Sequence, residues 1–449
     1  MQQQARPTVV QRAKQVGEDQ RNSWIEAAAW TGRMLAALER GVRGGVWFAL
    51  IDKVYRKNNL EAAYERVAQN GGSAGVDHVT VEDFGKHLKD ELARVSESLE
   101  KSTYRPQAIR RVYIPKADGG ERPLGIPTVR DRVVQAAVKQ VIEPIFEREF
   151  LSCSYGFRPN LGCKDALRAV SEMLQAQHTI VVDADIKSFF DTIKHDKLME
   201  LVSKRVQDGR MLNLLESFLH QGILEEGEER AGADAGTPQG GVISPLLANI
   251  YLHELDKVLM KNGYRLVRYA DDFVVLCDSK TEGEEVLALV TAVLTELGLT
   301  LHPDKTHIVD MQDAGAEFEF LGYRFKNHKG KILRYPRSKS IAKMRAAVRI
   351  RTPRLSGQSI EVIIDRLNQM LRGWYKYFRH SSSNAFPEYD SWIRMRLRAI
   401  LCYRAKGASR RYGLAHKRWP NRYFKSLRLF CLAEQHAQDR CQSATRQNS

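Results

Sequence analysis

The stretch Arg265-Leu-Val-Arg-Tyr-Ala-Asp-Asp-Phe-Val-Val-Leu-Cys277 consists of two largely apolar arms on either side of two adjacent acids, Asp271 and Asp272. Aromatic and β-branched residues are frequent in both arms, a pattern typical of two β-strands joined by a tight turn. Two neighbouring carboxylates repel each other and favour a cation nearby. Taken alone, an acidic turn is more often a solvated hairpin tip than a functional site.

A second strand pattern also carries acids. The stretch Thr179-Ile-Val-Val-Asp-Ala-Asp-Ile186 includes Asp183 and Asp185, and it runs into Lys187-Ser-Phe-Phe-Asp191. Two acid-bearing strands that lie far apart in the sequence can meet only in the folded chain. Mg²⁺ prefers one or two carboxylates together with substrate phosphates. The two stretches therefore outline a two-metal phosphoryl-transfer site.

The positive charge of the chain is concentrated at its C-terminal end. The 449 residues suggest about two to four domains. Residues 331–449 hold 27 Lys and Arg against 6 Asp and Glu, a net +21, whereas residues 1–330 hold 43 against 48, a net −5. Trp and Tyr residues interleave with these cations, as in surfaces that bind a phosphate backbone and stack on bases. The plainer alternative is a basic, solvated face.

Several classes of protein are disfavoured by composition. The six cysteines form no CxxC pair and no regular spacing, so neither a zinc module nor a disulfide framework is indicated. No apolar run approaches the length of a membrane span, and the first twenty residues lack the apolar centre of a signal peptide. We therefore expect a soluble, intracellular protein.

Local patterns predict further elements. Residues 108–123 alternate and turn back like a β-hairpin with a basic tip, and residues 129–150 are typical of an amphipathic helix. A Gly- and Pro-rich loop ends at Ser244, a plausible N-cap for the helix that follows. Residues 361–378 and 392–404 predict two basic helices, of which the first has one apolar face.

Eight motifs, found in order along the chain, resemble those of group II intron-encoded reverse transcriptases with a maturase domain. Any one of them recurs by chance, but eight in order is a specific match. They are residues 70–79, 115–127, 154–159, 185–191, 236–245, 269–272, 297–305 and 320–323. Residues 367–378 and 418–424 also resemble parts of the family's thumb and maturase domain X.

The resemblance implies an α+β fold, a right-hand polymerase with fingers and an antiparallel palm sheet, plus an α-helical thumb and maturase domain X. The expected divisions are residues 1–60 (N-terminal extension), 61–326 (fingers and palm), 335–432 (thumb and domain X) and 433–449 (polar tail). Because only a short polar tail follows Leu432, we expect no C-terminal endonuclease domain. Ser188 stands where many relatives have Gly.

The resemblance assigns catalysis and metal binding to Asp185, Asp271 and Asp272. These carboxylates would hold two Mg²⁺ ions, with Mn²⁺ as a substitute, and so activate the primer 3′-hydroxyl and stabilise the leaving pyrophosphate. Asp183 and Asp191 are the obvious rivals, because they belong to the same acidic stretch as Asp185.

The resemblance also assigns the substrate contacts. Those with the incoming dNTP would come from Lys116, Arg122, Phe190, Gln239 and Lys305. Phe190 would exclude the ribose 2′-hydroxyl, and Lys305 would donate a proton to pyrophosphate. The primer end would be gripped by Gly322 and Tyr323.

The implied function is RNA-directed DNA polymerisation, with the intron RNA as partner in splicing and in retrohoming by target-primed reverse transcription. The other partners would be an RNA template, a DNA primer or target DNA, and dNTPs. We expect no membrane partner and a location in the cytoplasm as a ribonucleoprotein. Two alternatives are a reverse transcriptase recruited to host defence or CRISPR spacer acquisition, and an RNA-binding splicing factor without polymerase activity.

Overall fold

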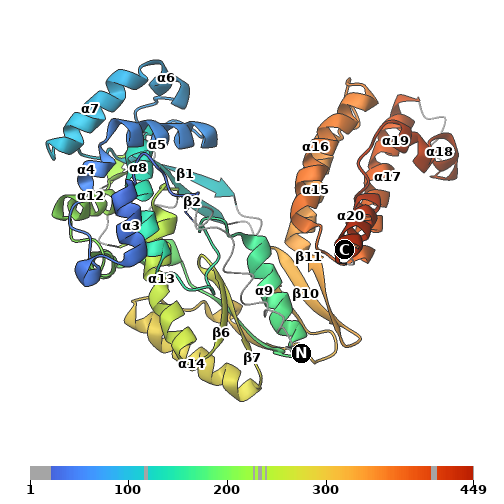
Figure 1. Ribbon diagram of the computed structural model, residues 1–449. Helices are drawn as coiled ribbons and strands as arrows, with labels where there is room; N and C mark the ends of the chain where they lie inside the picture. The colour runs from blue at the N-terminus through green and yellow to red at the C-terminus, as the bar shows by residue number, and fades with distance from the viewer. Residues whose placement is uncertain are drawn as a thin grey trace, which may run out of the picture. The chain divides into compact units, whose positions relative to one another are not determined.

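The chain divides into two compact units, unit 1 (Met1–Ile308) and unit 2 (Val309–Ser449). The computed structural model describes residues 22–115, 120–225, 228–230, 235–237, 240–405 and 412–447. Figure 1 follows these units from blue at the N-terminus to red at the C-terminus. Two of the residues assigned to dNTP contacts, Lys116 and Gln239, lie outside the described residues.

The two acid-bearing stretches belong to one four-stranded sheet of unit 1, with strand order β6-β7-β3-β8. Its strands are β3 (Ile180–Asp185), β6 (Arg265–Tyr269), β7 (Asp272–Cys277) and β8 (His307–Asp310). β6 and β7 form the predicted antiparallel hairpin, and β3 pairs antiparallel with the other edge of β7. The local strand patterns therefore predicted these three strands correctly.

β7 is buried on both faces. Phe273, Val275 and Cys277 belong to the main hydrophobic core of unit 1, whereas the alternate residues Val274 and Leu276 are buried outside that core. Helix α14 packs against β3 and β7, and helix α9 packs against β6 and β7. Within β7, Asp272 is the one residue that is partly open to solvent.

A second sheet in unit 1 has strand order β2-β1-β4-β5. Its strands are β1 (Ile109–Pro115), β2 (Glu121–Ile126), β4 (Ile223–Glu225) and β5 (Glu228–Arg230). β1 pairs antiparallel with β2, which confirms the predicted hairpin, and parallel with the short strand β4.

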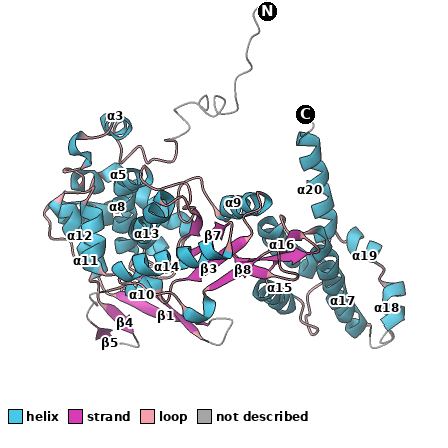
Figure 2. Cartoon of the chain, turned by 90° about the horizontal axis from the view of Figure 1, so that it is seen from below, coloured by secondary structure: helices cyan, strands magenta, loops and turns pink. Residues whose placement is uncertain are grey.

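Helices make up most of unit 1 around these strands (Figure 2). They are α3 (Gly32–Arg40), α4 (Ile51–Val54), α5 (Lys57–Asn70), α6 (Val81–Lys86), α7 (Leu88–Glu100), α8 (Val129–Glu147), α9 (Cys163–Gln175), α10 (Phe189–Thr192), α11 (His195–Ser203), α12 (Gly209–Leu219), α13 (Ser244–Lys261) and α14 (Lys280–Glu296), with short 3₁₀ helices η1 (Arg43–Gly45) and η2 (Pro303–Lys305).

Helix α8 differs from the amphipathic helix expected over residues 129–150. Nearly all of its residues are buried, including charged ones, because α4, α5 and α13 pack around it. The buried Asp131 carboxylate accepts hydrogen bonds from the Tyr104 hydroxyl and the Gln107 amide. A helix covered on several sides carries no continuous polar face, and a buried polar group such as the Asp131 carboxylate takes its partners from neighbouring segments.

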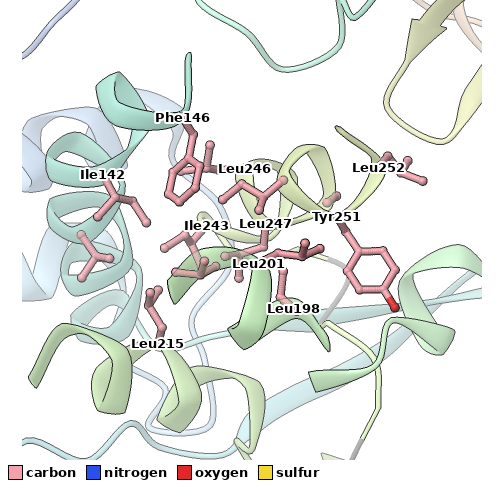
Figure 3. Packing of buried hydrophobic residues seen from close by; sticks show 14 of the residues in the cluster. Ile142, Phe146, Leu198, Leu201, Leu215, Ile243, Leu246, Leu247, Tyr251 and Leu252 are labelled. Carbon is pink, nitrogen blue, oxygen red and sulfur yellow. The ribbon is translucent and has the colours of Figure 1, made fainter. Parts of the chain in front are cut away.

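The core of unit 1 joins α8 to α11 and α13. Figure 3 shows Ile142 and Phe146 of α8 pointing toward Leu246 and Leu247 of α13. Ser244, predicted as the N-cap of α13, is instead its first helical residue, and Ile243 occupies the cap position. Pro is favoured in the first helical turn because its missing N–H has no partner there in any case, which is consistent with Pro245 in that turn.

Unit 2 begins with a three-stranded antiparallel sheet of order β11-β10-β9 and continues as helices. The strands are β9 (Glu317–Phe320), β10 (Tyr323–His328) and β11 (Lys331–Pro336). The helices are α15 (Ser338–Arg351), α16 (Ile360–Phe378), α17 (Phe386–Arg404), α18 (Tyr412–Arg418), α19 (Asn421–Ser426) and α20 (Leu432–Gln447), with a 3₁₀ turn η3 (Ser383–Ala385).

The helices of unit 2 pack around a core of their own. The predicted helix over residues 361–378 is α16, and its expected apolar face is buried. The second predicted helix begins six residues earlier than expected, at Phe386, with Pro387 in its first turn. The segment expected as a polar tail forms helix α20.

Antiparallel sheets and a helical C-terminal unit confirm the expected α+β class. Across the described part of the chain, no helix is long and apolar enough to cross a membrane.

Candidate catalytic site

The register of β3 and β7 brings two of the predicted catalytic carboxylates together. Asp185, the last residue of β3, lies directly opposite Asp272, the first residue of β7. Opposite residues of an antiparallel pair hold their Cβ atoms about 4.5–5.5 Å apart on the same face. The fold thus makes neighbours of two acids that are far apart in the sequence.

Asp271 lies in the turn between β6 and β7. Tyr269 pairs with Asp272, so the turn itself consists of Ala270 and Asp271. Ala270 has a φ of 58°, and positive φ values are typical of the two-residue turns that match the twist of a hairpin. Because Asp271 is outside both strands, the alternation of strand faces does not force it away from Asp272.

Lys305 contacts the same group of acids. Its Nζ atom donates a hydrogen bond to Asp185 Oδ2 at 2.7 Å. The His302 amide donates to the Asp185 carbonyl oxygen at 2.8 Å, which holds the segment before Lys305 beside the end of β3. The carboxylate of Asp185 is therefore paired with one positive charge, the Lys305 ammonium.

The two rival acids lie elsewhere. Asp183 pairs with Val274, two residues farther from the turn than Asp185. Asp191 lies on α10 and lines a cleft of about 330 Å³ together with Arg111 and Gly236. Neither rival occupies the position opposite Asp272.

The chemistry of the three assigned carboxylates suits a divalent metal ion. Among the described residues there is no group of three or more His, Cys, Asp or Glu side chains arranged to hold a metal ion. Mg²⁺ rarely needs such a cage, since it usually binds through one or two carboxylates and takes its other ligands from substrate phosphates and water. Asp185, Asp271 and Asp272 are hard oxygen donors, and all three are partly exposed.

Phe190 and the loop at Gly236 lie side by side. The Thr237 amide donates to the Phe190 carbonyl at 2.7 Å, and the Gly236 amide donates to the Ile193 carbonyl at 2.8 Å. The Phe190 ring is partly buried and meets the ring of Phe189 edge to face, with 5.2 Å between the centroids. The Phe190 ring therefore packs against the buried ring of Phe189.

Gly240 brings the same loop close to the β1–β2 hairpin. Its φ is 117°, and a Cβ atom at this position would lie 2.3 Å from the Gly125 carbonyl oxygen. Only glycine allows this approach. Arg122 pairs with Ile114 in the hairpin; the fingertip turn that precedes it lies outside the described residues.

Gly322 and Tyr323, the predicted primer grip, belong to unit 2. Tyr323 is fully buried, and its hydroxyl donates to the Tyr377 carbonyl oxygen at 2.6 Å. Burial raises the pKa of Tyr323 to about 12. Gly322 lies in the turn between β9 and β10 with a φ of 79°. The Tyr323 side chain is therefore enclosed within unit 2.

Comparison with known proteins identifies the family. A sequence model described as "Reverse transcriptase (RNA-dependent DNA polymerase)" matches residues 114–325, and one described as "Group II intron, maturase-specific domain" matches residues 341–419. Protein YkfC of Escherichia coli (strain K12) is 36% identical over 304 residues, which cover 59% of this chain and 79% of that protein. This chain belongs to the group II intron reverse transcriptase/maturase family.

Other relatives are longer. The group II intron-encoded protein LtrA of Lactococcus lactis subsp. cremoris is 39% identical over 219 residues, covering 48% of this chain and 36% of LtrA. An uncharacterized 91 kDa protein in the cob intron of Schizosaccharomyces pombe is 32% identical over 320 residues, covering 58% of this chain and 39% of that protein. The chain thus spans well under half the length of these two relatives.

A solved chain of the "Partial Cas6-RT-Cas1--Cas2 complex" aligns with this chain at 22% sequence identity and a TM-score of 0.36. The aligned part covers 55% of this chain and 42% of the solved chain. A score this low carries no weight for fold or function. The two family matches confirm the predicted reverse transcriptase with a maturase domain and do not favour the host-defence or polymerase-free alternatives.

Proposed function

We propose that this chain copies RNA into DNA at the carboxylates Asp185, Asp271 and Asp272, and that it acts with a group II intron RNA in splicing and in retrohoming by target-primed reverse transcription. The observation that carries the catalytic half is the pairing of Asp185 with Asp272 beside the turn that holds Asp271. The match to the maturase-specific domain supports the splicing half.

Reverse transcriptases of this family generally use divalent metal ions, and we propose two Mg²⁺ ions here, with Mn²⁺ as a substitute. Asp185, Asp271 and Asp272 would hold them. Bound metal would lower the pKa of the primer 3′-hydroxyl and neutralise charge on the leaving pyrophosphate. The chain's own part is to hold the carboxylates in fixed positions, because phosphoryl transfer depends mostly on positioning and charge.

The incoming dNTP would lie between the fingers hairpin and the carboxylates. Lys116 and Arg122 would bind its triphosphate, since Arg suits bidentate phosphate contacts. Phe190 would close the space beside C2′ of the sugar, and Gln239 would lie near the new base pair. Lys305, which reaches Asp185 at 2.7 Å, would be close enough to meet the phosphates and pass a proton to pyrophosphate. The backbone at Gly322 and Tyr323 would support the primer.

Unit 2 would supply the main contact with intron RNA. Arg345 and Arg349 lie over the ring of Trp392, and Arg418 lies over the ring of Trp419. Trp419 is buried and Trp392 is partly buried, so these rings hold the guanidinium groups in place, and the cations themselves suit a phosphate backbone. The net charge of +21 in residues 331–449 supports the same partner.

The test is extension of a DNA primer on an RNA template with dNTPs and Mg²⁺. We expect Asp271→Asn to lose activity by about 10²-fold or more, because one shared metal ligand is removed, and to keep its affinity for RNA. Asp196→Asn, which changes an exposed acid on α11, is the matched control and should behave like wild type. Near-normal extension by Asp271→Asn would refute the catalytic assignment.

A further inference from the structure

Arg268 is a fully buried arginine directly beneath the catalytic turn. Its side chain is 0% exposed, and it lies in strand β6 between the buried Val267 and the partly buried Tyr269. Nε and Nη2 donate to the two carboxylate oxygens of Asp256 at 2.7 and 2.5 Å. Nη1 donates to Asn249 Oδ1 at 3.0 Å and to the Ala270 carbonyl oxygen at 2.9 Å. One guanidinium thus joins a helix to the residue before Asp271.

Helix α13 provides both acceptors from one face. Asn249 and Asp256 are seven residues apart, about two helical turns, so their side chains lie above one another. Both are buried, at 1% and 0% exposure. Burial acts to raise the pKa of Asp256, but the charge and hydrogen bonds of Arg268 outweigh it and lower that pKa below its ordinary value. The carboxylate is therefore ionised and fully paired.

A third segment is tied to the same network. Asn249 Nδ2 donates to the Gly156 carbonyl oxygen at 2.8 Å. The Arg268 amide donates to the Cys153 carbonyl and the Tyr155 amide donates to the Arg268 carbonyl, each at 2.8 Å. A Cβ atom on Gly156 would lie 2.4 Å from the Ala270 nitrogen. The backbone at Gly156 therefore packs directly against the turn at Ala270.

The turn needs support of this kind. Ala270 has a φ of 58°, a region in which residues other than glycine are strained and which persists only when surrounding contacts fix it. The hydrogen bond from Arg268 to the Ala270 carbonyl fixes the orientation of the peptide group that leads into Asp271. An apolar pair of similar volume would fill the same space, but it would have no donor for this carbonyl.

We infer that Arg268, held by Asp256 and Asn249, is a positioning residue that sets the turn carrying Asp271. The inference deepens the proposed function, because it concerns the geometry of the proposed metal ligands. A buried ion pair often adds little to stability compared with apolar side chains. The network is therefore better explained by the conformation that it specifies than by the stability that it adds.

The test compares full-length variants in which the network is altered conservatively. Arg268→Lys keeps the charge but cannot reach Asp256 and Ala270 together, and Asp256→Asn removes the charge that orients the guanidinium. Hydrogen exchange of the backbone amides in residues 268–273 reports directly on the turn. We expect exchange there to rise by about tenfold or more in both variants, and Mn²⁺ affinity without nucleic acid to fall about 10- to 100-fold.

Asp208→Asn is the control for general destabilisation. Asp208 is 6% exposed in unit 1 and accepts hydrogen bonds from four backbone amides, none of them in the turn. Its melting temperature should fall, while exchange at residues 268–273 and Mn²⁺ affinity stay as in wild type. If Arg268→Lys or Asp256→Asn does not fold, Asn249→Ala tests the same point, since it removes neutral hydrogen bonds and leaves the ion pair.

Wild-type exchange at residues 268–273 in a folded Arg268→Lys or Asn249→Ala variant would overturn the inference. A wild-type protein that neither binds Mn²⁺ nor extends a primer would instead refute the proposed function. The two failures are distinguishable, because the exchange measurement requires neither metal nor activity.

Discussion

At the scale of single residues, the proposed site combines a charged contact, made by Lys305, with a bulky aromatic ring, that of Phe190. Lys305 donates to Asp185 from an exposed position, 60% open to solvent, so the pair is worth only about 0.2–1 kcal/mol. Under the proposed function, a divalent ion at Asp185 would replace this contact at small cost and leave the Lys305 ammonium to meet phosphate. Phe190 is proposed to act by exclusion, and its position is fixed because its ring packs against Phe189 and its carbonyl accepts a hydrogen bond from the Thr237 amide.

Phe190→Ala should raise the incorporation of rNTP relative to dNTP, because removing the ring opens space beside the 2′-carbon of the sugar. A loss of one to two orders of magnitude in discrimination corresponds to about 1.4–2.8 kcal/mol. The measurement is kcat/KM for matched rNTP and dNTP on one primer and template. Phe190→Tyr, which keeps the bulk, should retain discrimination. An unchanged ratio in a folded Phe190→Ala protein would exclude the assignment.

At the scale of elements, the site depends on contacts between segments that are not neighbours in sequence. Gly236 and Thr237 lie beside α10, and Gly240 approaches Gly125 in the β1–β2 hairpin. These close neighbours in the sequence therefore contact both the segment that carries Phe190 and the hairpin proposed to meet the triphosphate. A shift of about 1 Å in such a part can cost about 10²-fold in rate.

Gly240→Ala should reduce kcat/KM for dNTP by about 10- to 100-fold, since its Cβ would collide with the Gly125 carbonyl oxygen and its φ of 117° disfavours alanine. Gly209→Ala is the matched control, because a Cβ there meets nothing within 4 Å. Both proteins should be compared by steady-state primer extension and by melting temperature. Equal kcat/KM values in the two variants would mean that the close approach of Gly240 to Gly125 does not affect dNTP incorporation.

The sequence predicted the local strands of this site and, through the resemblance, that their acids meet, but it did not predict the register or the individual contacts. Strands β3, β6 and β7 follow from alternation and β-branched residues, which are local signals. The pairing of Asp185 with Asp272 depends on strand register, and the Lys305 contact joins residues 120 apart; neither is encoded in a short window. Arg268 gave a signal that was overlooked, since a charged residue within an apolar strand needs a buried partner.

At the scale of the whole molecule, positive charge is concentrated in the C-terminal residues, which form most of unit 2. Residues 331–449 carry a net +21, and residues 1–330 carry a net −5. Helix α15 has several exposed cations and no acidic residue. Binding that is dominated by phosphate contacts releases counterions, so affinity falls linearly on a log–log plot against salt, with a slope set by the number of contacts. Unit 2 is thus expected to set the salt dependence of RNA binding.

The part that the unit 2 cations play in RNA binding can be measured in the full-length chain. Four exposed cations of unit 2 are changed to Gln: Lys339, Lys343, Arg349 and Arg354. The control changes four exposed cations of unit 1: Lys57, Lys89, Arg94 and Lys204.

If each unit 2 cation meets a phosphate, the slope of log affinity for intron RNA against log salt should become shallower by about 3, at about 0.7–0.9 per contact. The control should keep the wild-type slope, because the net charge of the chain changes equally in both proteins and only the contacts differ. Equal slopes in the two variants would show that general charge, and not unit 2, governs RNA binding, and the maturase proposal would lose its main electrostatic support.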